Sequence, residues 1–236
     1  MSDDPPPPRR ILLFDIDGTL LTSGGAGRRA MDQVFRRCFG LPGDARPTDG
    51  IDFAGASDLR VVREIFDAHG RAFGPAQQER FAALFAEALR AGMQSRPARL
   101  LPGVVPLLDR LRAAPVLLAL GTGNFRRTAF VKLAHFGLDG YFDSSPRGGA
   151  FGDDGVNRPE FLAAGLARVR PLAAPDADVV VIGDTPLDIE GGRSIGARVV
   201  AVASGFSPRA ELAAAAPDVL LDDLADLDAA LAAILG

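Results

Sequence analysis

Hydrophobic residues in this chain form several short, unbroken runs in which they do not alternate with polar residues. Such runs are typical of strands buried on both faces of a parallel sheet. The sequence predicts strands at residues 11–14, 116–120, 179–182 and 199–202, with a weaker one at 219–221. Helical patterns at 125–135 and 159–169 separate the later runs. Strands that alternate with helices indicate an α/β fold with a doubly wound, mostly parallel sheet.

A helical stretch interrupts this rhythm after the first strand. Residues 28–39, 58–69 and 76–93 have helical patterns, and no convincing buried strand lies among them. In the last of these, apolar residues such as Phe81, Leu84 and Phe85 recur on one helix face. We therefore expect a small all-helical domain at 22–100, inserted into an α/β core formed by 10–21 and 101–236. The glycine-rich segment 24–27 is the expected joint between them.

The composition adds expectations about the surroundings of the protein. Apolar residues make up 47% of the 236 residues, and the formal net charge is −4, so no basic surplus points to nucleic acid. No run approaches the roughly 18 apolar residues of a membrane span. Residues 1–9 are acidic and then proline-rich, which predicts a disordered leader rather than a signal peptide. Cys38 is the only cysteine, so no disulfide can form within the chain, and we expect its side chain in the core. A reducing cytoplasm fits this cysteine content. We expect no membrane partner. Nothing in the composition indicates the oligomeric state.

Two carboxylates directly follow the first predicted strand, in the segment Asp15-Ile16-Asp17-Gly18-Thr19. In open α/β sheets, ligands bind at the carboxyl ends of the strands. Two like charges this close are costly unless a cation or hydrogen bonds compensate for them. The pair therefore suggests a metal ion, Mg²⁺, and chemistry on an oxyanion. Thr19 either caps the turn after Gly18 or touches this site.

Three further motifs carry candidate chemistry. Thr122 follows a buried strand, and the amides of Gly123 and Asn124 lie at the start of the next helix. Arg158 places a cation at another helix start, in the segment 157–160. A third strand ends in Ile182-Gly183-Asp184-Thr185-Pro186-Leu187-Asp188, which adds two more acids. Helix starts bind phosphate oxygens through their free amides.

In order and spacing, these four motifs resemble those of the haloacid dehalogenase superfamily of phosphohydrolases. The inserted helical segment lies where that superfamily carries its first type of cap. The segments 102–104 and 136–142 are similar to stretches of the phosphoglycolate phosphatase-like branch. The resemblance covers nearly the whole chain after the leader and implies a core with a helical cap that closes over the substrate.

The resemblance also implies roles for individual residues. Asp15 would be the nucleophile that forms an aspartyl-phosphate, and Asp17 the general acid and then the general base. The side chains of Asp15 and Asp184 and the backbone carbonyl of Asp17 would hold Mg²⁺, which prefers hard oxygen ligands. Asp188 would hold a metal-bound water or the basic residue. The residues expected at the phosphate oxygens are Thr122, Gly123, Asn124 and Arg158.

The basic residue departs from the family pattern, because the superfamily usually has a lysine where this chain has Arg158. An arginine is always charged and can bind two phosphate oxygens at once, so we expect activity to survive the exchange. In the alternative reading, Arg158 only caps its helix and the site is weakened. Lys132 is the only lysine of the chain. It lies ten residues past Thr122 on a helix expected to run away from the site, and we expect it at the surface.

The sequence thus predicts a Mg²⁺-dependent phosphomonoester hydrolase that acts on a small phosphorylated metabolite. The presence of Asp17 argues against a dehalogenase. A phosphomutase of the β-phosphoglucomutase type and a catalytically weak phosphate-binding protein stay open as alternatives. Arg28 or Arg29, after the glycine-rich joint, either reaches a second anionic group of the substrate or belongs to a solvated helix face.

Overall fold

A parallel six-stranded sheet forms the centre of the protein, for which a computed structural model describes residues 6–94, 97–142 and 148–236. The strands lie in the order β5-β4-β1-β6-β7-β8, and each pair of neighbours is parallel. Their bounds are β1 (Arg10–Phe14), β4 (Val116–Gly121), β5 (Gly149–Ala150), β6 (Asp178–Gly183), β7 (Arg198–Val202) and β8 (Val219–Leu221). The predicted α/β fold is confirmed, including the weak strand at 219–221. The two-residue edge strand β5 was not predicted.

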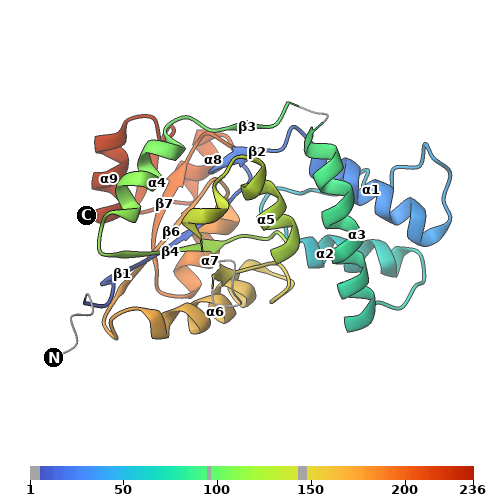
Figure 1. Ribbon diagram of the computed structural model, residues 1–236, viewed down its shortest axis with the longest axis horizontal. Helices are drawn as coiled ribbons and strands as arrows, with labels where there is room; N and C mark the ends of the chain where they lie inside the picture. The colour runs from blue at the N-terminus through green and yellow to red at the C-terminus, as the bar shows by residue number, and fades with distance from the viewer. Residues whose placement is uncertain (1–5, 95–96, 143–147) are drawn as a thin grey trace.

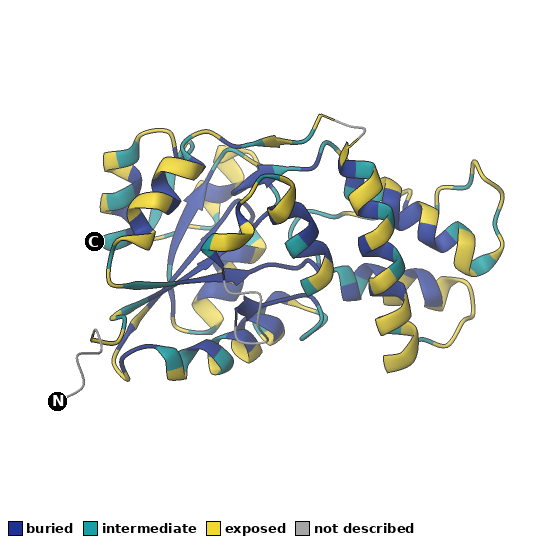
Figure 2. Ribbon diagram, in the orientation of Figure 1, coloured by how far each residue is buried: buried dark blue, intermediate teal, exposed yellow. Residues whose placement is uncertain are grey.

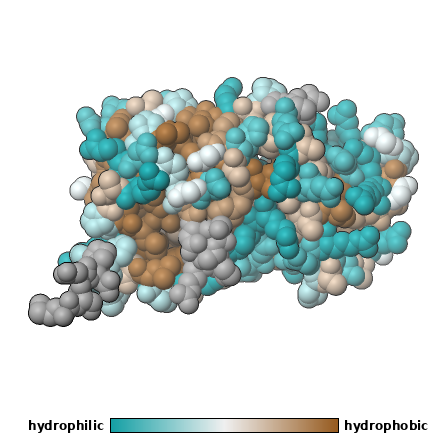
Figure 3. Space-filling view, in the orientation of Figure 1, coloured by the Kyte–Doolittle hydropathy of each residue, from teal (hydrophilic) through white to brown (hydrophobic). Residues whose placement is uncertain are grey.

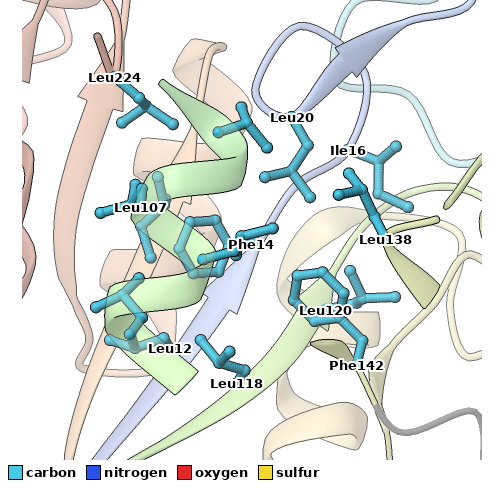
Figure 4. Packing of buried hydrophobic residues seen from close by; sticks show 14 of the residues in the cluster. Leu12, Phe14, Ile16, Leu20, Leu107, Leu118, Leu120, Leu138, Phe142 and Leu224 are labelled. Carbon is cyan, nitrogen blue, oxygen red and sulfur yellow. The ribbon is translucent and has the colours of Figure 1, made fainter. Parts of the chain in front are cut away.

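Helices cover both faces of the sheet. Successive side chains of β1 point to opposite faces, so each face has apolar residues that must be buried against helices. Leu12 and Phe14 pack on one face against helices α4 (Val104–Arg112), α5 (Arg126–His135) and α9 (Leu227–Leu235). Figure 4 shows Leu107 of α4 over this face, and the rings of Phe14 and Phe142 meet edge-on. Ile11 and Leu13 pack on the other face, against α6 (Arg158–Val169). The strands are accordingly buried along most of their length (Figure 2).

Three helices are inserted between β1 and α4, as the sequence predicted: α1 (Ala26–Phe39), α2 (Asp58–Ala68) and α3 (Pro75–Gln94). We call them the inserted helices. They have their own hydrophobic cluster, centred on Phe35, Phe66 and Phe81. They form the right end of the molecule in Figure 1, opposite α9 and the C-terminus. The surface over them is largely hydrophilic in Figure 3, whereas hydrophobic residues gather on the left half of that face.

A short antiparallel ribbon joins the inserted helices to the core. It consists of β2 (Leu21–Thr22) and β3 (Arg99–Leu100), in which Leu21 pairs with Leu100. Gly24 and Gly25 follow β2 with φ angles of 57° and 77°, a left-handed conformation that favours glycine. The expected joint at 24–27 thus contains the turn that leads into α1.

The starts of two helices near the sheet edge are fixed by side chains. Asn157 caps α6 by accepting a hydrogen bond from the amide of Glu160. Thr185 caps α7 (Pro186–Ser194) and forms a reciprocal pair with Asp188, in which each side chain accepts from the backbone amide of the other residue. Such caps satisfy amides that the helix leaves free. They also set the positions of Arg158 and Asp188.

The remaining elements are the short helix α8 (Arg209–Ala214) and two 3₁₀ helices, η1 (Asp139–Tyr141) and η2 (Arg170–Leu172). Two expectations need correction. Cys38 is exposed rather than in the core, because it lies on the solvent side of α1. The carbonyls of Pro8 and Arg9 accept hydrogen bonds from the amides of Ala174 and Asp178, so these two residues of the expected leader are bound to the core. Among the described residues, no helix is long and apolar enough to cross a membrane.

Candidate active site

The three central strands bring the predicted acids and hydroxyl together. β1 lies between β4 and β6, so Asp15, Thr122 and Asp184 follow neighbouring strands at one edge of the sheet. All three side chains are buried. Gly18 adopts a φ of 87°, and a Cβ there would lie 2.2 Å from a carboxylate oxygen of Asp184. Only glycine therefore fits where the Asp15–Thr19 loop passes Asp184.

Arg158 lies between two carboxylates of this site. Its Nη2 is 3.5 Å from Oδ1 of Asp15, and its Nη1 forms an ion pair with Oδ1 of Asp188. The arginine is only 4% exposed, so both pairs are shielded from water. A role for Arg158 limited to capping its helix does not fit this geometry, because Asn157 supplies the cap. Asp188 contacts the basic residue, one of the two roles expected for it.

Burial makes the acids at the sheet edge hard to ionise together. The pKa of Asp15 is raised, mainly by burial; Arg158 opposes this shift and the charge of Asp17 adds to it. Burial and the charge of Asp15 raise the pKa of Asp184 to about 7. Asp184 also accepts hydrogen bonds from the amide of Phe206 at 2.6 Å and from the hydroxyl of Thr19 at 3.4 Å. Thr19 therefore touches the site.

The donor set at this edge fits a hard divalent cation. The carboxylates of Asp15 and Asp184 and the backbone carbonyl of Asp17 are oxygen donors of the kind that Mg²⁺ prefers. A cation would also offset the repulsion between the buried acids. Within the described part of the chain, no three side chains of His, Cys, Asp or Glu form a metal-binding group. The expected set differs from such a group, since it has two carboxylates and one main-chain oxygen.

Lys132 belongs to the site, contrary to the expectation that it lies at the surface. It is 5% exposed, and its Nζ lies 2.5 Å from both Oδ2 of Asp17 and Oδ1 of Asn124. The amide nitrogen of Asn124 in turn donates to Asp17 Oδ2 and to the hydroxyl of Thr122, each at 2.8 Å. No local pattern in the sequence marked this position.

These contacts bear on the phosphate-binding roles expected for the Thr122 loop. The side chain of Asn124 is engaged by Asp17, Thr122 and Lys132, and its backbone amide points to the hydroxyl of Thr122 at 3.3 Å. The structure thus places Asn124 at the site as a link between other side chains. Gly123 lines the cavity described next.

A cavity of about 210 Å³ lies over Asp15 and Asp17. Its walls come from both parts of the protein. The core contributes residues that include Lys132, Arg158 and Asp184, and the inserted helices and their loops contribute Arg28, Met31, Phe53 and Phe85. The guanidinium of Arg28 donates to the carbonyls of Thr48 and Ile51 and lies over the ring of Phe53, 4.4 Å from its centre. Arg28 is therefore part of the cavity wall.

The loop before α2 closes one side of the cavity. The backbone amide of Asp58 donates to the carbonyl of Gly123 at 2.7 Å, and the hydroxyl of Ser57 donates to the carbonyl of Val156 at 2.7 Å. A Cβ on Gly123 would lie 2.4 Å from the carbonyl oxygen of Ala56, so the two loops are in close contact. Ser57 also caps α2, because its hydroxyl accepts a hydrogen bond from the amide of Arg60. Sequence reasoning missed that Asp58 contacts the core.

Comparisons with known proteins give a consistent family. The sequence model of the haloacid dehalogenase-like hydrolases matches residues 10–196. A phosphoglycolate phosphatase of Synechococcus elongatus is 31% identical, over 92% of this chain and 94% of its own. The tyrosine-protein kinase PtkA of Mycobacterium tuberculosis is 30% identical over 87% of this chain, and the match spans 66% of the kinase's length.

Comparison with solved structures agrees with the family found from the sequence. CbbY from Rhodobacter sphaeroides, solved in complex with phosphate, superposes with a TM-score of 0.69 over 96% of this chain and 99% of its own, at 22% identity. That identity supports a shared fold only. The family model covers most of the chain, and the motifs that suggested the resemblance lie within the matched range. The chain therefore belongs to the haloacid dehalogenase-like hydrolases.

Proposed function

We propose that this protein is a Mg²⁺-dependent phosphatase that hydrolyses a small phosphorylated metabolite through an aspartyl-phosphate on Asp15. One observation carries the proposal. Asp15 lies at the floor of the cavity with Arg158 beside it, and Asp17 lines the same cavity with Lys132 bound to it. A nucleophile, a proton carrier and cations around one small cavity are what phosphoryl transfer needs.

In the first step, a carboxylate oxygen of Asp15 attacks the phosphorus atom and the bond from phosphorus to the leaving oxygen breaks. Asp17 gives its proton to that oxygen, and the product alcohol departs. Arg158 stabilises the negative charge on the phosphoryl oxygens, because it is buried and cannot be screened by water. A carboxylate attacks a phosphate dianion only when such charge is neutralised.

In the second step, water attacks the phosphorus of the aspartyl-phosphate, Asp17 takes a proton from the water, and the bond to Asp15 breaks. Inorganic phosphate leaves and Asp15 is regenerated. Mg²⁺ held by Asp15, Asp184 and the carbonyl of Asp17 would neutralise charge and orient the phosphoryl group. Thr122 accepts hydrogen bonds from Asn124 and lies next to Asp15, which suits its hydroxyl to a phosphoryl oxygen.

The size and lining of the cavity limit the substrate. A volume of about 210 Å³ suits a phosphoryl group and a short organic part. Several curated relatives that match most of this chain are named phosphoglycolate phosphatase, so short phosphorylated acids are the first candidates. We propose that residues 22–100, which contain the inserted helices, act as a cap that admits substrate by moving on the joint at 24–27.

Phosphate release from a panel of metabolite esters, with Mg²⁺ present, tests this function. Asp15→Asn should abolish release and leave the fold unchanged, whereas Asp44→Asn, at an exposed acid of the loop between α1 and α2, should have no effect. Equal turnover by Asp15→Asn and the unmodified protein would refute the mechanism. The same panel should include a hexose 1-phosphate assayed for isomerisation and ATP with a tyrosine peptide. Product in either assay without free phosphate would favour a mutase or a kinase.

A further inference from the structure

The single lysine of the chain forms the centre of a buried network around Asp17. Nζ of Lys132 donates to Oδ2 of Asp17 and to Oδ1 of Asn124, both at 2.5 Å. Asn124 donates to the same oxygen of Asp17 at 2.8 Å. Within the described residues, all hydrogen bonds from side chains to the Asp17 carboxylate meet at Oδ2. Asp17 lines the cavity, and no hydrogen bond from a described side chain occupies its Oδ1.

This arrangement fixes one rotamer of Asp17. A free aspartate at a cavity wall rotates among several staggered states, and only some of them aim an oxygen at the reacting group. Two donors on one oxygen remove that freedom, and the ammonium is itself held by Asn124. A charge-assisted bond in a shielded site is also stronger than one in water. Lys132 and Asn124 therefore orient the carboxylate before substrate binds.

The position of Lys132 on α5 explains how it reaches the site. Side chains on a helix lean toward its N-terminus, and α5 begins at Arg126, next to the Thr122–Asn124 loop. The long side chain thus reaches back to the sheet edge. Its helix neighbour Leu133 packs into the hydrophobic core, which fixes the rotation of the helix.

We propose that Lys132 is a positioning residue that aims Oδ1 of Asp17 at the leaving oxygen of the substrate. The inference rests on the proposed phosphatase function, in which Asp17 transfers that proton. It assigns to Lys132 a task separate from that of Arg158. Arg158 contacts the nucleophile, whereas Lys132 contacts the proton carrier.

The dependence of rate on the leaving group tests this role. Without Lys132, proton transfer to the leaving oxygen is poorly aligned, so alkyl phosphates, whose alkoxides leave badly without a proton, should suffer most. We expect Lys132→Met to lower kcat/KM by about 10²-fold on a short alkyl phosphate, a typical contribution of general acid catalysis. The loss in kcat/KM on 2,4-dinitrophenyl phosphate, which needs no proton to leave, should be much smaller. The comparison uses kcat/KM because it reports the steps up to departure of the leaving group, whereas kcat also includes the hydrolysis of the aspartyl-phosphate, in which Asp17 acts on either substrate.

Matched variants separate positioning from packing. Arg127→Met removes an exposed cation from the same helix and should leave both substrates unaffected. Lys132→Ala should regain part of its alkyl phosphate activity when methylamine is added, since the amine can occupy the vacated space. An equal loss in kcat/KM on both substrates, or no rescue by the amine, would overturn the positioning role.

A second measurement does not require activity. Because Lys132 is the only lysine, ¹⁵N-lysine labelling gives one side-chain ammonium signal. We expect a slowly exchanging ammonium in the unmodified protein and rapid exchange in Asp17→Ala. Rapid exchange in both would overturn the contact itself. A protein that shows the ordered ammonium but hydrolyses none of the panel would instead refute the proposed function and, with it, the catalytic task of Lys132.

Discussion

The carboxylate of Asp58 accepts a hydrogen bond from the backbone amide of Phe125, with 2.7 Å between Oδ2 and the nitrogen. The same oxygen accepts from the hydroxyl of Thr128 at 3.1 Å. Asp58 lies in the first turn of α2, and Phe125 directly precedes α5. An acid from the inserted helices therefore caps a helix of the core, and this helix carries Lys132. Acidic groups stabilise helix starts in this way.

This contact predicts that docking of the inserted helices depends on pH. Burial raises the pKa of Asp58 to about 6, so the docked state holds its proton more tightly than a state with Asp58 in water. Docking should be most favourable below about pH 4, weaken between about pH 4 and 6, and level off above that. Asp58→Asn should remove the dependence, since an amide does not titrate in this range.

Cys38 offers a way to measure docking, because it is exposed on α1 and is the only cysteine. A second label at Asp228→Cys, on the exposed side of α9, would report the distance between the inserted helices and the core. We expect a larger share of long distances at pH 7 than at pH 5. Equal distributions at both pH values in the protein with Asp58 intact would refute this coupling.

The sequence predicted the acids and missed much of what surrounds them. Asp15, Thr122 and Asp184 were predictable because each follows a buried apolar strand, and strand ends of a parallel sheet meet at one edge. Lys132 was not, since its place depends on the rotation of α5 and on a long side chain that reaches backward. The contact of Asp58 with Phe125 joins residues 67 positions apart, and no local pattern encodes it.

The fold, too, was only partly predictable from the sequence. The apolar runs predicted five strands of the sheet, because hydrophobic burial selects them. β5 and the β2–β3 ribbon have two residues per strand, too few for a periodic pattern. They form because neighbouring segments offer hydrogen-bond partners: Leu120 pairs with Gly149, and Leu21 with Leu100.

Loss of Arg158 should destabilise the protein as well as inactivate it. The arginine is buried between Asp15 and Asp188, so Arg158→Met would leave two buried carboxylates without their cation. Breaking a buried ion pair in this way costs about 3–5 kcal/mol in the free energy of unfolding. Denaturant unfolding measures this change. Arg209→Met, at an exposed pair with Asp222, is the control and should cost at most about 1 kcal/mol.

Arg158→Lys addresses the departure from the family pattern. A lysine keeps the charge but provides a single donor point where the guanidinium reaches two carboxylates. We expect most of the stability and a measurable rate of phosphate release to remain. A variant as inactive as Arg158→Met would show that both contacts of the guanidinium are required.

The raised pKa of Asp184 predicts how the stabilisation of the protein by Mg²⁺ varies with pH. In the metal-free protein its pKa is raised to about 7, so stability should fall as the pH rises from about 4 to 7 and stay level above that. At the proposed metal site, Mg²⁺ would bind the ionised carboxylate and offset its repulsion with Asp15. The rise in Tm on adding Mg²⁺ should therefore be larger at pH 8 than at pH 6. Asp184→Asn should lose both the rise and its dependence on pH.

The close contact between Gly123 and the loop before α2 leads to a prediction about how the inserted helices dock on the core. A Cβ at this position would lie 2.4 Å from the carbonyl oxygen of Ala56, which is too short for any packing, and 3.0 Å from Cα of Ser57, which is tighter than most Cβ contacts. Both contacts are with backbone, so no side chain can turn aside, and the loop before α2 must move away. Gly123→Ala should thus weaken docking while the sheet and its helices stay folded.

The expected result for Gly123→Ala is a raised KM for phosphate esters and more long distances between labels at Cys38 and at Asp228→Cys, with little change in the free energy of unfolding of the core. Gly140→Ala is the matched control, since its Cβ would meet nothing within 4 Å. If Gly123→Ala instead kept KM and label distances unchanged, the close contact between the two loops would have no part in substrate binding, and closure would have to depend on other contacts, such as that between Ser57 and Val156.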